Sequence, residues 1–354
     1  FWFKITQGED VIQTAWKTKT PEPAPRFASA SFMIGNNIYV IGGQNRAIIP
    51  TNTNEAYDVI TNTWSTKANY PVLADGVFGF EVNGIGYCAG GLNANLQPMV
   101  NAYSYNPNTN TWTKVTDLPE PLASVNSTTS YGEYGYCIGG ITATGKTSDR
   151  VYRFTPATST WNMITNMPLP RYSPAVESLN GKIYAIGGSD SLGNIYGDVQ
   201  IYDIATNTWS TGKNMLNPRG FSGSFKHEND IYVVGGLDEI QYATNLNEIY
   251  NTKTNTWKND IPMTYIRTSL CGEANKSKGY AIGGIDIARA NVNGYVEEYS
   301  FFQSESSFEM LINTTLGSKT VSIPMTQDGN YNYWIDWGDE FSSTQITTYN
   351  DTNA

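Results

Sequence analysis

Four arginine residues share one position in a repeated pattern and could bind an anion. Arg26, Arg171, Arg219 and Arg267 each lie sixteen residues before the first residue of a glycine pair. A planar guanidinium group binds carboxylate or phosphate through two parallel hydrogen bonds. If the four side chains line one mouth of a channel, they form an arc that can capture an acidic ligand.

Aspartates at a second repeated position allow a different interpretation. Asp190, Asp238 and Asp286 each follow an arginine by nineteen residues, whereas Asn45 stands at that distance from Arg26. These carboxylates could form ion pairs that neutralise the arginines of their own repeats. The two interpretations are compatible, because an arc can stiffen the mouth and also contact a ligand. All seven charged residues are therefore candidate ligand-binding residues.

Metal and nucleophile chemistry is restricted by the rarity of histidine and cysteine. His227 is the only histidine, so a copper or zinc site with several histidine ligands is impossible. A Ser-His-Asp arrangement would require this residue to lie in a cleft. Cys88 and Cys137 occupy equivalent repeat positions, which predicts small buried side chains. We therefore assign no catalytic residue, no metal site and no cofactor.

The elements that must position the candidate residues follow from a sixfold repeat. A tyrosine, two residues and a glycine pair recur with first glycines 48 or 49 residues apart, and a tryptophan keeps the same period. Such a period is typical of repeat architectures. The first glycines are Gly42, Gly90, Gly139, Gly187, Gly235 and Gly283, and the tryptophans are Trp16, Trp64, Trp112, Trp161, Trp209 and Trp257.

One repeat is interpreted as four antiparallel strands. Residues 27–34 form a first strand, and residues 38–41 form a second that is apolar at every position, which predicts burial on both faces. The third strand carries Tyr57, and a turn leads to the fourth strand with Trp64. Four strands in about 48 residues match one blade of a β-propeller.

The strand ending in Gly-Gly, the spaced tyrosine and the later tryptophan resemble the signature of kelch repeats, over about residues 11–302. The resemblance implies an all-β, six-bladed kelch-type β-propeller within residues 1–302. Trp16 has no glycine pair upstream, and the sixth repeat lacks a tryptophan in register. We therefore expect the segment Val11–Lys17 to complete blade six and remove the exposed edges.

The pattern changes after residue 302. Strands are expected at 308–312, 320–323 and 331–337. The run from Tyr331 to Asp339 resembles the start of BspA-like or PKD-like domains of bacterial surface proteins, although Glu340 replaces the usual glycine. Residues 303–354 are expected to be a partial β-sandwich-like domain or, alternatively, an extension packed on the propeller. Because the chain starts at Phe1, we expect it to be part of a longer multidomain protein.

Variable loops after the glycine pairs provide a second set of candidates on the rim of the same mouth. Loops commonly carry recognition residues on a rigid scaffold. The charged, aromatic and apolar candidates in these loops are Arg46, Met99, Tyr196, Tyr242 and Arg289.

Composition narrows the class of partner. A net charge of -10 opposes binding to nucleic acid, and no apolar run is long enough to span a membrane. The leading hypothesis is a secreted or cell-surface recognition module that binds a glycan or protein through the Gly-Gly-side mouth and rim. One alternative is a sugar-modifying enzyme, since some similar six-bladed kelch proteins epimerise sialic acid. Another is a structural or receptor-binding part of a fibre or phage tip.

Overall fold

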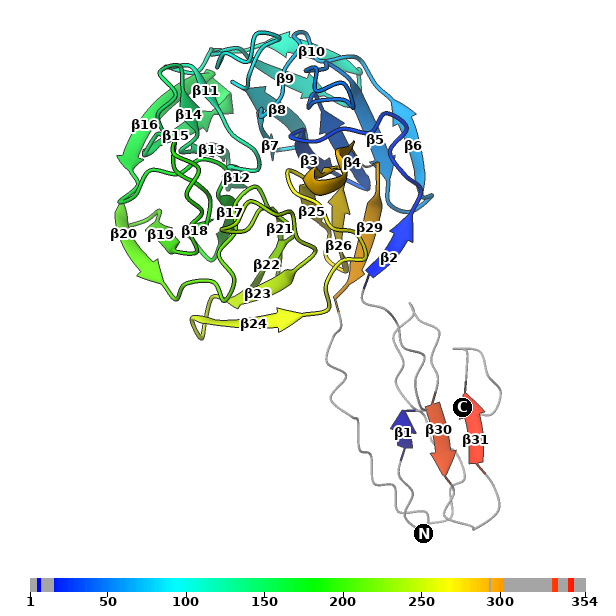
Figure 1. The fold of residues 1–354 in the computed structure, drawn as a ribbon. Helices are drawn as coiled ribbons and strands as arrows, with labels where there is room; N and C mark the ends of the chain where they lie inside the picture. The colour runs from blue at the N-terminus through cyan, green and yellow to red at the C-terminus, as the bar shows by residue number, and fades with distance from the viewer. Residues whose placement is uncertain (1–4, 8–15, 293, 302–332, 337–342, 347–354) are drawn as a thin grey trace. The chain divides into compact units, whose positions relative to one another are not determined.

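The computed structural model describes residues 5–7, 16–292, 294–301, 333–336 and 343–346. The chain divides into two compact units, of which the larger spans Ala15–Phe301. This unit consists of six four-stranded antiparallel sheets arranged as blades around a central axis (Figure 1), along which the innermost strands line a cavity. The predicted all-β, six-bladed propeller is therefore confirmed. The helices of the described part are two 3-10 turns, η1 (Pro156–Thr158) and η2 (Ile287–Arg289).

Each of the first three blades has its strands in sequence order from the channel outward. Blade one contains β3 (Ala30–Ile34), β4 (Asn37–Ile41), β5 (Asn54–Asp58) and β6 (Thr63–Thr66). Blade two contains β7 (Phe78–Val82), β8 (Ile85–Ala89), β9 (Ala102–Asn106) and β10 (Thr111–Lys114). Blade three contains β12 (Thr128–Tyr131), β13 (Tyr134–Ile138), β15 (Arg150–Thr155) and β16 (Thr160–Asn166).

Blades four and five repeat this order, and blade six combines strands from both ends of the propeller. Blade four contains β17 (Ala175–Leu179), β18 (Lys182–Ile186), β19 (Val199–Asp203) and β20 (Thr208–Gly212). Blade five contains β21 (Gly223–His227), β22 (Asp230–Val234), β23 (Asn247–Asn251) and β24 (Thr256–Asp260). Blade six contains β25 (Cys271–Ala274), β26 (Lys278–Ile282), β29 (Val296–Ser300) and β2 (Trp16–Lys19).

Blade six closes the ring, as the sequence predicts. Strand β2 pairs antiparallel with β29, placing Trp16 opposite Tyr299. The strand begins at Trp16 and ends at Lys19, so the predicted span 11–17 is displaced, and residues 11–15 lie outside the described residues. The Trp16 indole Nε1 donates to the Ile261 carbonyl of blade five at 2.9 Å. The first tryptophan therefore fastens the last blade to its neighbour.

The glycine pairs form the junctions between blades. The N–H of Gly43 donates to the carbonyl of Ala74 at the start of blade two, and Gly188 bonds Arg219 at the start of blade five in the same way. A Cβ atom on Gly42 or Gly187 would collide with these same carbonyl oxygens. Both first glycines also have positive φ, 64° and 63°. Only glycine satisfies both requirements, which explains why the pair recurs in every blade.

A closed ring of hydrogen bonds surrounds the channel where the chain enters the innermost strands. Each blade contributes one backbone N–H, and blade three contributes the Ser124 hydroxyl oxygen as an acceptor in place of a carbonyl. The ring runs from Gly76 N to Ala28 O, Ala28 N to Ser269 O, Ser269 N to Phe221 O, Phe221 N to Ser173 O, Ser173 N to Ser124 Oγ, and Ser124 N to Gly76 O.

Two further short two-stranded sheets lie on the side of the glycine pairs, which we call the Gly-Gly face. One is the hairpin of β27 (Ile285–Asp286) and β28 (Asn291–Val292), and the other pairs β11 (Leu122–Ala123) with β14 (Ile141–Thr142), which are separated in the chain by β12 and β13. Within the described part of the chain, no helix is long and apolar enough to cross a membrane.

The smaller unit comprises Phe1–Thr14 and Phe302–Ala354. Its described strands are β1 (Ile5–Gln7), β30 (Tyr333–Asp336) and β31 (Ser343–Ile346), with β30 in the centre. The first residues of the chain thus group with the C-terminal segment, whereas the sequence placed them with the propeller. The strand expected at 331–337 corresponds to β30, while those at 308–312 and 320–323 and the Trp337–Asp339 motif lie outside the described residues.

Candidate functional site

The four predicted arginines lie at the Gly-Gly face, each in a different blade and each inside the protein. Arg26, Arg171, Arg219 and Arg267 are between 0% and 3% exposed. Each precedes an innermost strand, and each backbone carbonyl accepts the N–H of the preceding blade's second glycine. The guanidinium groups therefore point into the blades, so they do not present an open arc at the channel mouth.

Every one of these guanidinium groups is neutralised by acids other than the predicted ones. Arg26 Nη2 lies 2.6 Å from Glu22 and 3.2 Å from Glu55. The other pairs are Arg219 with Glu248 at 3.2 Å, Arg267 with Glu297 at 2.8 Å, and Arg171 with Asp198. The interpretation as ion pairs within a blade is correct in kind for blades four to six, but its acidic partners were wrong. Apart from Glu22, which precedes Arg26 by four residues, the partners lie on or just before the third strand, which returns beside the arginine.

Burial changes the proton affinities in these clusters. Loss of hydration lowers the pKa of Arg219 to about 10, although Glu248 opposes the change. Burial likewise raises the pKa of Glu22 to about 7, and the neighbouring Glu55 carboxylate adds to the rise, whereas Arg26 opposes it. The clusters hold charge at high cost, which is typical of structural networks as well as of functional ones.

The predicted aspartates instead organise the hairpins that follow the glycine pairs. Asp190 accepts hydrogen bonds from the N–H groups of Leu192 at 2.8 Å and Asn194 at 3.0 Å, and from the Tyr196 hydroxyl at 2.9 Å. These hydrogen bonds outweigh the effect of burial and lower the pKa of Asp190 to about 2. Its carboxylate thus fixes the turn, as expected for aspartate at the start of a tight loop.

Equivalent residues cap four of the other hairpins. Asn45, Asn93 and Asp238 each accept two backbone N–H bonds from residues two and four positions later. Asp286 accepts from the Arg289 N–H and also pairs with its guanidinium at 3.1 Å. Because the same geometry recurs, the hairpins present their tips as preorganised structures, which lowers the entropic cost of binding.

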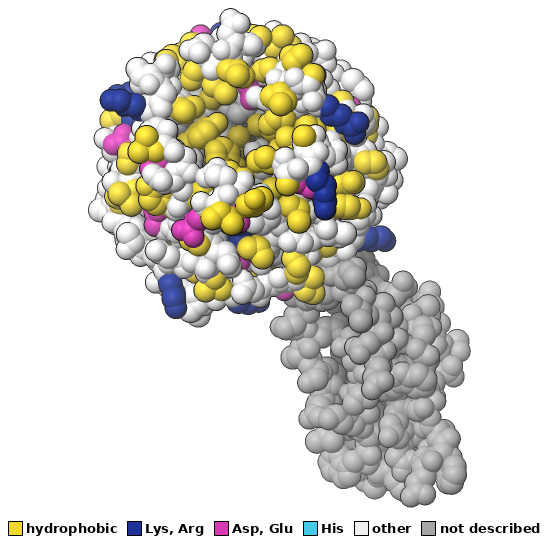
Figure 2. All heavy atoms as spheres, viewed as in Figure 1, with side chains coloured by type: hydrophobic (Ala, Val, Ile, Leu, Met, Phe, Trp, Pro, Cys, Tyr) yellow, Lys and Arg dark blue, Asp and Glu magenta, His cyan; other side chains and the backbone are white. Residues whose placement is uncertain are grey.

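Large apolar side chains are concentrated on these hairpin tips. We define the apolar rim as the exposed residues Ile48, Ile49, Leu96, Leu192, Ile240, Tyr242 and Ile287. They come from the hairpins of five blades, and their exposures run from 47% for Ile287 to 86% for Leu192. Figure 2 shows hydrophobic side chains gathered around a hollow at the centre of the face that carries η2.

The predicted rim candidates divide into exposed and half-buried residues. Arg46, Tyr242 and Arg289 are exposed, as expected for contact residues. Met99 is half-buried and packs against the core between blades one and two. Tyr196 is also half-buried, and its ring lies under the Arg171 guanidinium at 3.9 Å from the centroid. The exposed apolar tips Ile48, Leu192 and Ile240 complete the surface.

One buried acid near the mouth, Asp75, was not among the residues predicted from the sequence. Asp75 is 3% exposed and accepts a hydrogen bond from the Gln44 side-chain amide, while its Oδ1 has no partner. Burial raises its pKa to about 6. Ala74 occupies the arginine position of this blade, and Asp75 has no ion pair among the described residues. It is the next residue after that position, which a blade-by-blade alignment of the sequence could have flagged.

The remaining chemistry-bearing residues occupy structural positions. His227 stacks on Phe301 with ring centroids 4.1 Å apart. Cys88 and Cys137 are buried as predicted, and so is Cys271. Burial raises the pKa of each thiol, which opposes nucleophilic behaviour. Among the residues with described placement, no cluster of histidine, cysteine and acidic residues has metal-binding geometry.

Comparison with known proteins places this geometry among kelch domains. A Kelch motif matches residues 25–69 and 82–119, and the KLHDC2/KLHL20/DRC7 Kelch-repeats domain matches residues 124–289. A solved structure titled "Structure of YjhT" has a TM-score of 0.70 and 15% identity, covering 83% of this chain and 99% of that one. At this identity the likeness concerns the fold alone. No curated protein matches the sequence.

Proposed function

Since the chain forms a six-bladed β-propeller of kelch repeats, we propose that it is a recognition module that binds a protein partner across its Gly-Gly face. The observation that carries the proposal is the apolar rim, in which seven large side chains lie exposed on five preorganised hairpins. Exposed apolar clusters bordered by polar groups mark interaction sites in soluble proteins.

The chemistry of the rim favours a protein over a glycan. Six of its seven residues are isoleucine or leucine, and Tyr242 is its one aromatic residue. Aliphatic side chains gain free energy by packing against apolar partner groups, about 25 cal/mol for each Å² removed from water. A hydroxyl-rich glycan offers less apolar surface to such a site. The polar neighbours Arg46 and Arg289 would contact the margin of the partner.

The sugar-modifying alternative loses the groups on which it rested. It required arginines at the channel mouth to bind an acidic sugar, and these four side chains are buried and ion-paired. An extracellular or cell-surface setting, with a role in adhesion, is proposed on the sequence of the C-terminal segment alone. Binding as part of a fibre or phage tip would use the same rim.

The test compares the effect on partner affinity of an aspartate placed on the apolar rim with that of an aspartate placed away from it. A photo-crosslinking residue at Leu192 identifies the partner, and the affinity of the purified pair is then measured by biolayer interferometry. We expect Ile240→Asp to weaken binding by at least about tenfold, because it buries an unpaired carboxylate. Ile60 lies in the β5–β6 turn and is 71% exposed, and Ile60→Asp should leave the affinity unchanged.

Two results would contradict the proposal. Equal affinity of Ile240→Asp and the unaltered chain would remove the rim from the binding site. Binding confined to glycans on an array, with no protein crosslinked through Leu192, would replace the protein partner by a carbohydrate.

A further inference from the structure

A cavity lies within the channel itself, separate from the apolar rim. It has a volume of about 320 Å³ and is lined by the innermost strands of all six blades. At its inner end lies Asn126, whose side-chain Nδ2 donates to the carbonyls of Ser222 at 2.9 Å and Leu270 at 2.6 Å. This amide reaches from blade three to blades five and six. The amide therefore lies across the channel next to the hydrogen-bond ring.

The other end of the cavity faces away from the Gly-Gly face. Met33, Glu81, Ser130, Lys226 and Ala274 lie towards the ends of their strands on that side and are all half-buried. Solvent thus has access from the face opposite the rim. The volume is at the lower end of the range of small-molecule pockets, about 300–1,000 Å³.

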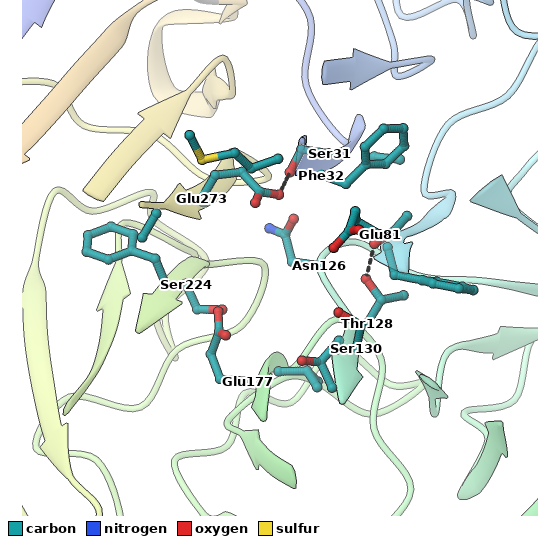
Figure 3. A pocket seen from close by; sticks show the side chains of 18 of the residues that line it. Ser31, Phe32, Glu81, Asn126, Thr128, Ser130, Glu177, Ser224 and Glu273 are labelled. Carbon is teal, nitrogen blue, oxygen red and sulfur yellow. Dashed lines mark hydrogen bonds between the residues drawn. The ribbon is translucent and has the colours of Figure 1, made fainter. Parts of the chain in front are cut away.

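Three glutamates surround the cavity, and two of them have no cationic partner among the residues whose placement is described. Figure 3 shows Glu81, Glu177 and Glu273 placed around the central Asn126. Glu177 has Lys226 at 3.7 Å and accepts the Ser224 hydroxyl at 3.0 Å. Glu273 accepts the Ser31 hydroxyl at 2.7 Å, and Glu81 accepts the Gly84 N–H at 2.5 Å. Neither has a lysine or arginine in ion-pair range within the described structure.

The geometry points to a binding site for a small aliphatic amine in this cavity. An ammonium group would donate hydrogen bonds to the Glu273 and Glu81 carboxylates, whose second oxygens remain available for such contacts. Three carboxylates against one lysine give the cavity a negative balance that disfavours anionic ligands.

The raised pKa of Glu273 is consistent with a carboxylate that has no positively charged partner among the described residues of the cavity. Its pKa is raised to about 7, chiefly by burial and also by Glu177 and Glu81, whose effects outweigh the lowering by the Ser31 hydroxyl and Lys226. The other titratable group nearby is the buried Cys271 thiol. A bound ammonium would favour the ionised carboxylate, so amine binding should be tighter at pH 8 than at pH 5.5.

Isothermal titration calorimetry of the full chain with 1,4-diaminobutane tests the site. We expect the diamine to bind the unaltered chain, whereas the neutral analogue 1,4-butanediol should not bind. Glu273→Gln keeps an acceptor for Ser31 but removes the charge, and should weaken binding by at least about tenfold. The matched variant Glu239→Gln, on an exposed rim hairpin, should leave binding unchanged.

Other outcomes overturn the assignment. These are no heat of binding from folded protein, equal affinity for the diol, or an unchanged affinity in Glu273→Gln. Calcium binding that Glu273→Gln abolishes would make the cavity a metal site instead. If Glu273→Gln does not fold, Glu81→Gln, at the half-buried end of the cavity, decides the question. At an amine site, Glu81→Gln should also weaken the binding of the diamine, and calcium should give no heat of binding. Loss of rim binding has no bearing on these results.

Discussion

At the scale of single residues, the buried Arg219–Glu248 pair shows why the arginine position is restrictive. Both side chains are fully buried, and the Glu248 carboxylate also accepts two hydrogen bonds from Asn217, at 3.0 and 2.7 Å. Removing one partner of a buried ion pair leaves an uncompensated charge. We expect Glu248→Ala to lower the free energy of unfolding by about 3–5 kcal/mol, measured by urea denaturation.

A double variant separates the cost of an isolated charge from the value of the pair. Arg219→Met combined with Glu248→Leu removes both charges and fills the space with apolar atoms. This chain should be more stable than Glu248→Ala alone, because apolar replacement of a whole buried pair is often tolerated. A urea midpoint for Glu248→Ala equal to that of the unaltered chain would show that Arg219 finds water or another acceptor.

The sequence contained the correct acid for two of these arginines. Glu55 and Glu248 both stand thirteen residues after the first glycine of their repeat, so they occupy equivalent repeat positions. The aspartates chosen from the sequence stand only three residues after the first glycine. Spacing alone cannot decide between the two, because the answer depends on which strand returns beside the arginine. Blade four shows a further limit. Gln200 occupies the acid position and bonds the Leu169 backbone, so Arg171 pairs with Asp198 instead.

At the scale of the element, side chains of complementary size meet at the interface between neighbouring blades, which we call the seam. Phe32, Phe80 and Phe225 on innermost strands each occupy the space where a glycine of the next blade lacks a Cβ, at Gly86, Gly135 and Gly279. Where the innermost residue is Thr129, Glu177 or Glu273, the corresponding residue of the next blade is isoleucine. Those isoleucines are Ile183, Ile231 and Ile38. Because isoleucine fills the space at these seams, the innermost position does not need a phenylalanine, and it holds Glu177 and Glu273 in two of them.

This matching predicts a compensating pair of substitutions. Gly86→Ile should collide with the Phe32 ring and destabilise the protein by about 1–3 kcal/mol or more. Phe32→Thr alone should also destabilise it, because it leaves a cavity. The double variant reproduces the Thr129–Ile183 combination, so it should be more stable than either single variant in thermal unfolding. Strictly additive losses in the double variant would refute this matching of side-chain size at the seam.

At the scale of the whole molecule, the period of the glycine pairs was enough to predict six blades, and the displaced tryptophans were enough to predict ring closure. It could not predict the interior of the channel, because that depends on departures from the repeat. The 49-residue interval before Gly139 places an additional residue in blade three, and there Asn126 crosses the channel and Ser124 enters the hydrogen-bond ring through its side chain. A departure of one residue is visible in the sequence, but its consequence requires the positions of blades five and six.

Ring closure by β2 makes the stability of all six blades depend on one four-residue strand. Trp16 is 4% exposed, packs against Tyr299 with ring centroids 5.1 Å apart, and bonds blade five through Ile261. A chain starting at Thr20 would lose this strand and expose the edge of β29, whereas a chain starting at Trp16 would retain it. We expect the Thr20 chain to melt lower by on the order of 10 °C, since burial of one tryptophan alone contributes about 3–5 kcal/mol. It should also self-associate in size-exclusion chromatography, because an unpaired strand edge recruits other chains. Equal melting temperatures for the two truncated chains would mean that the blade interfaces hold the ring without this strand.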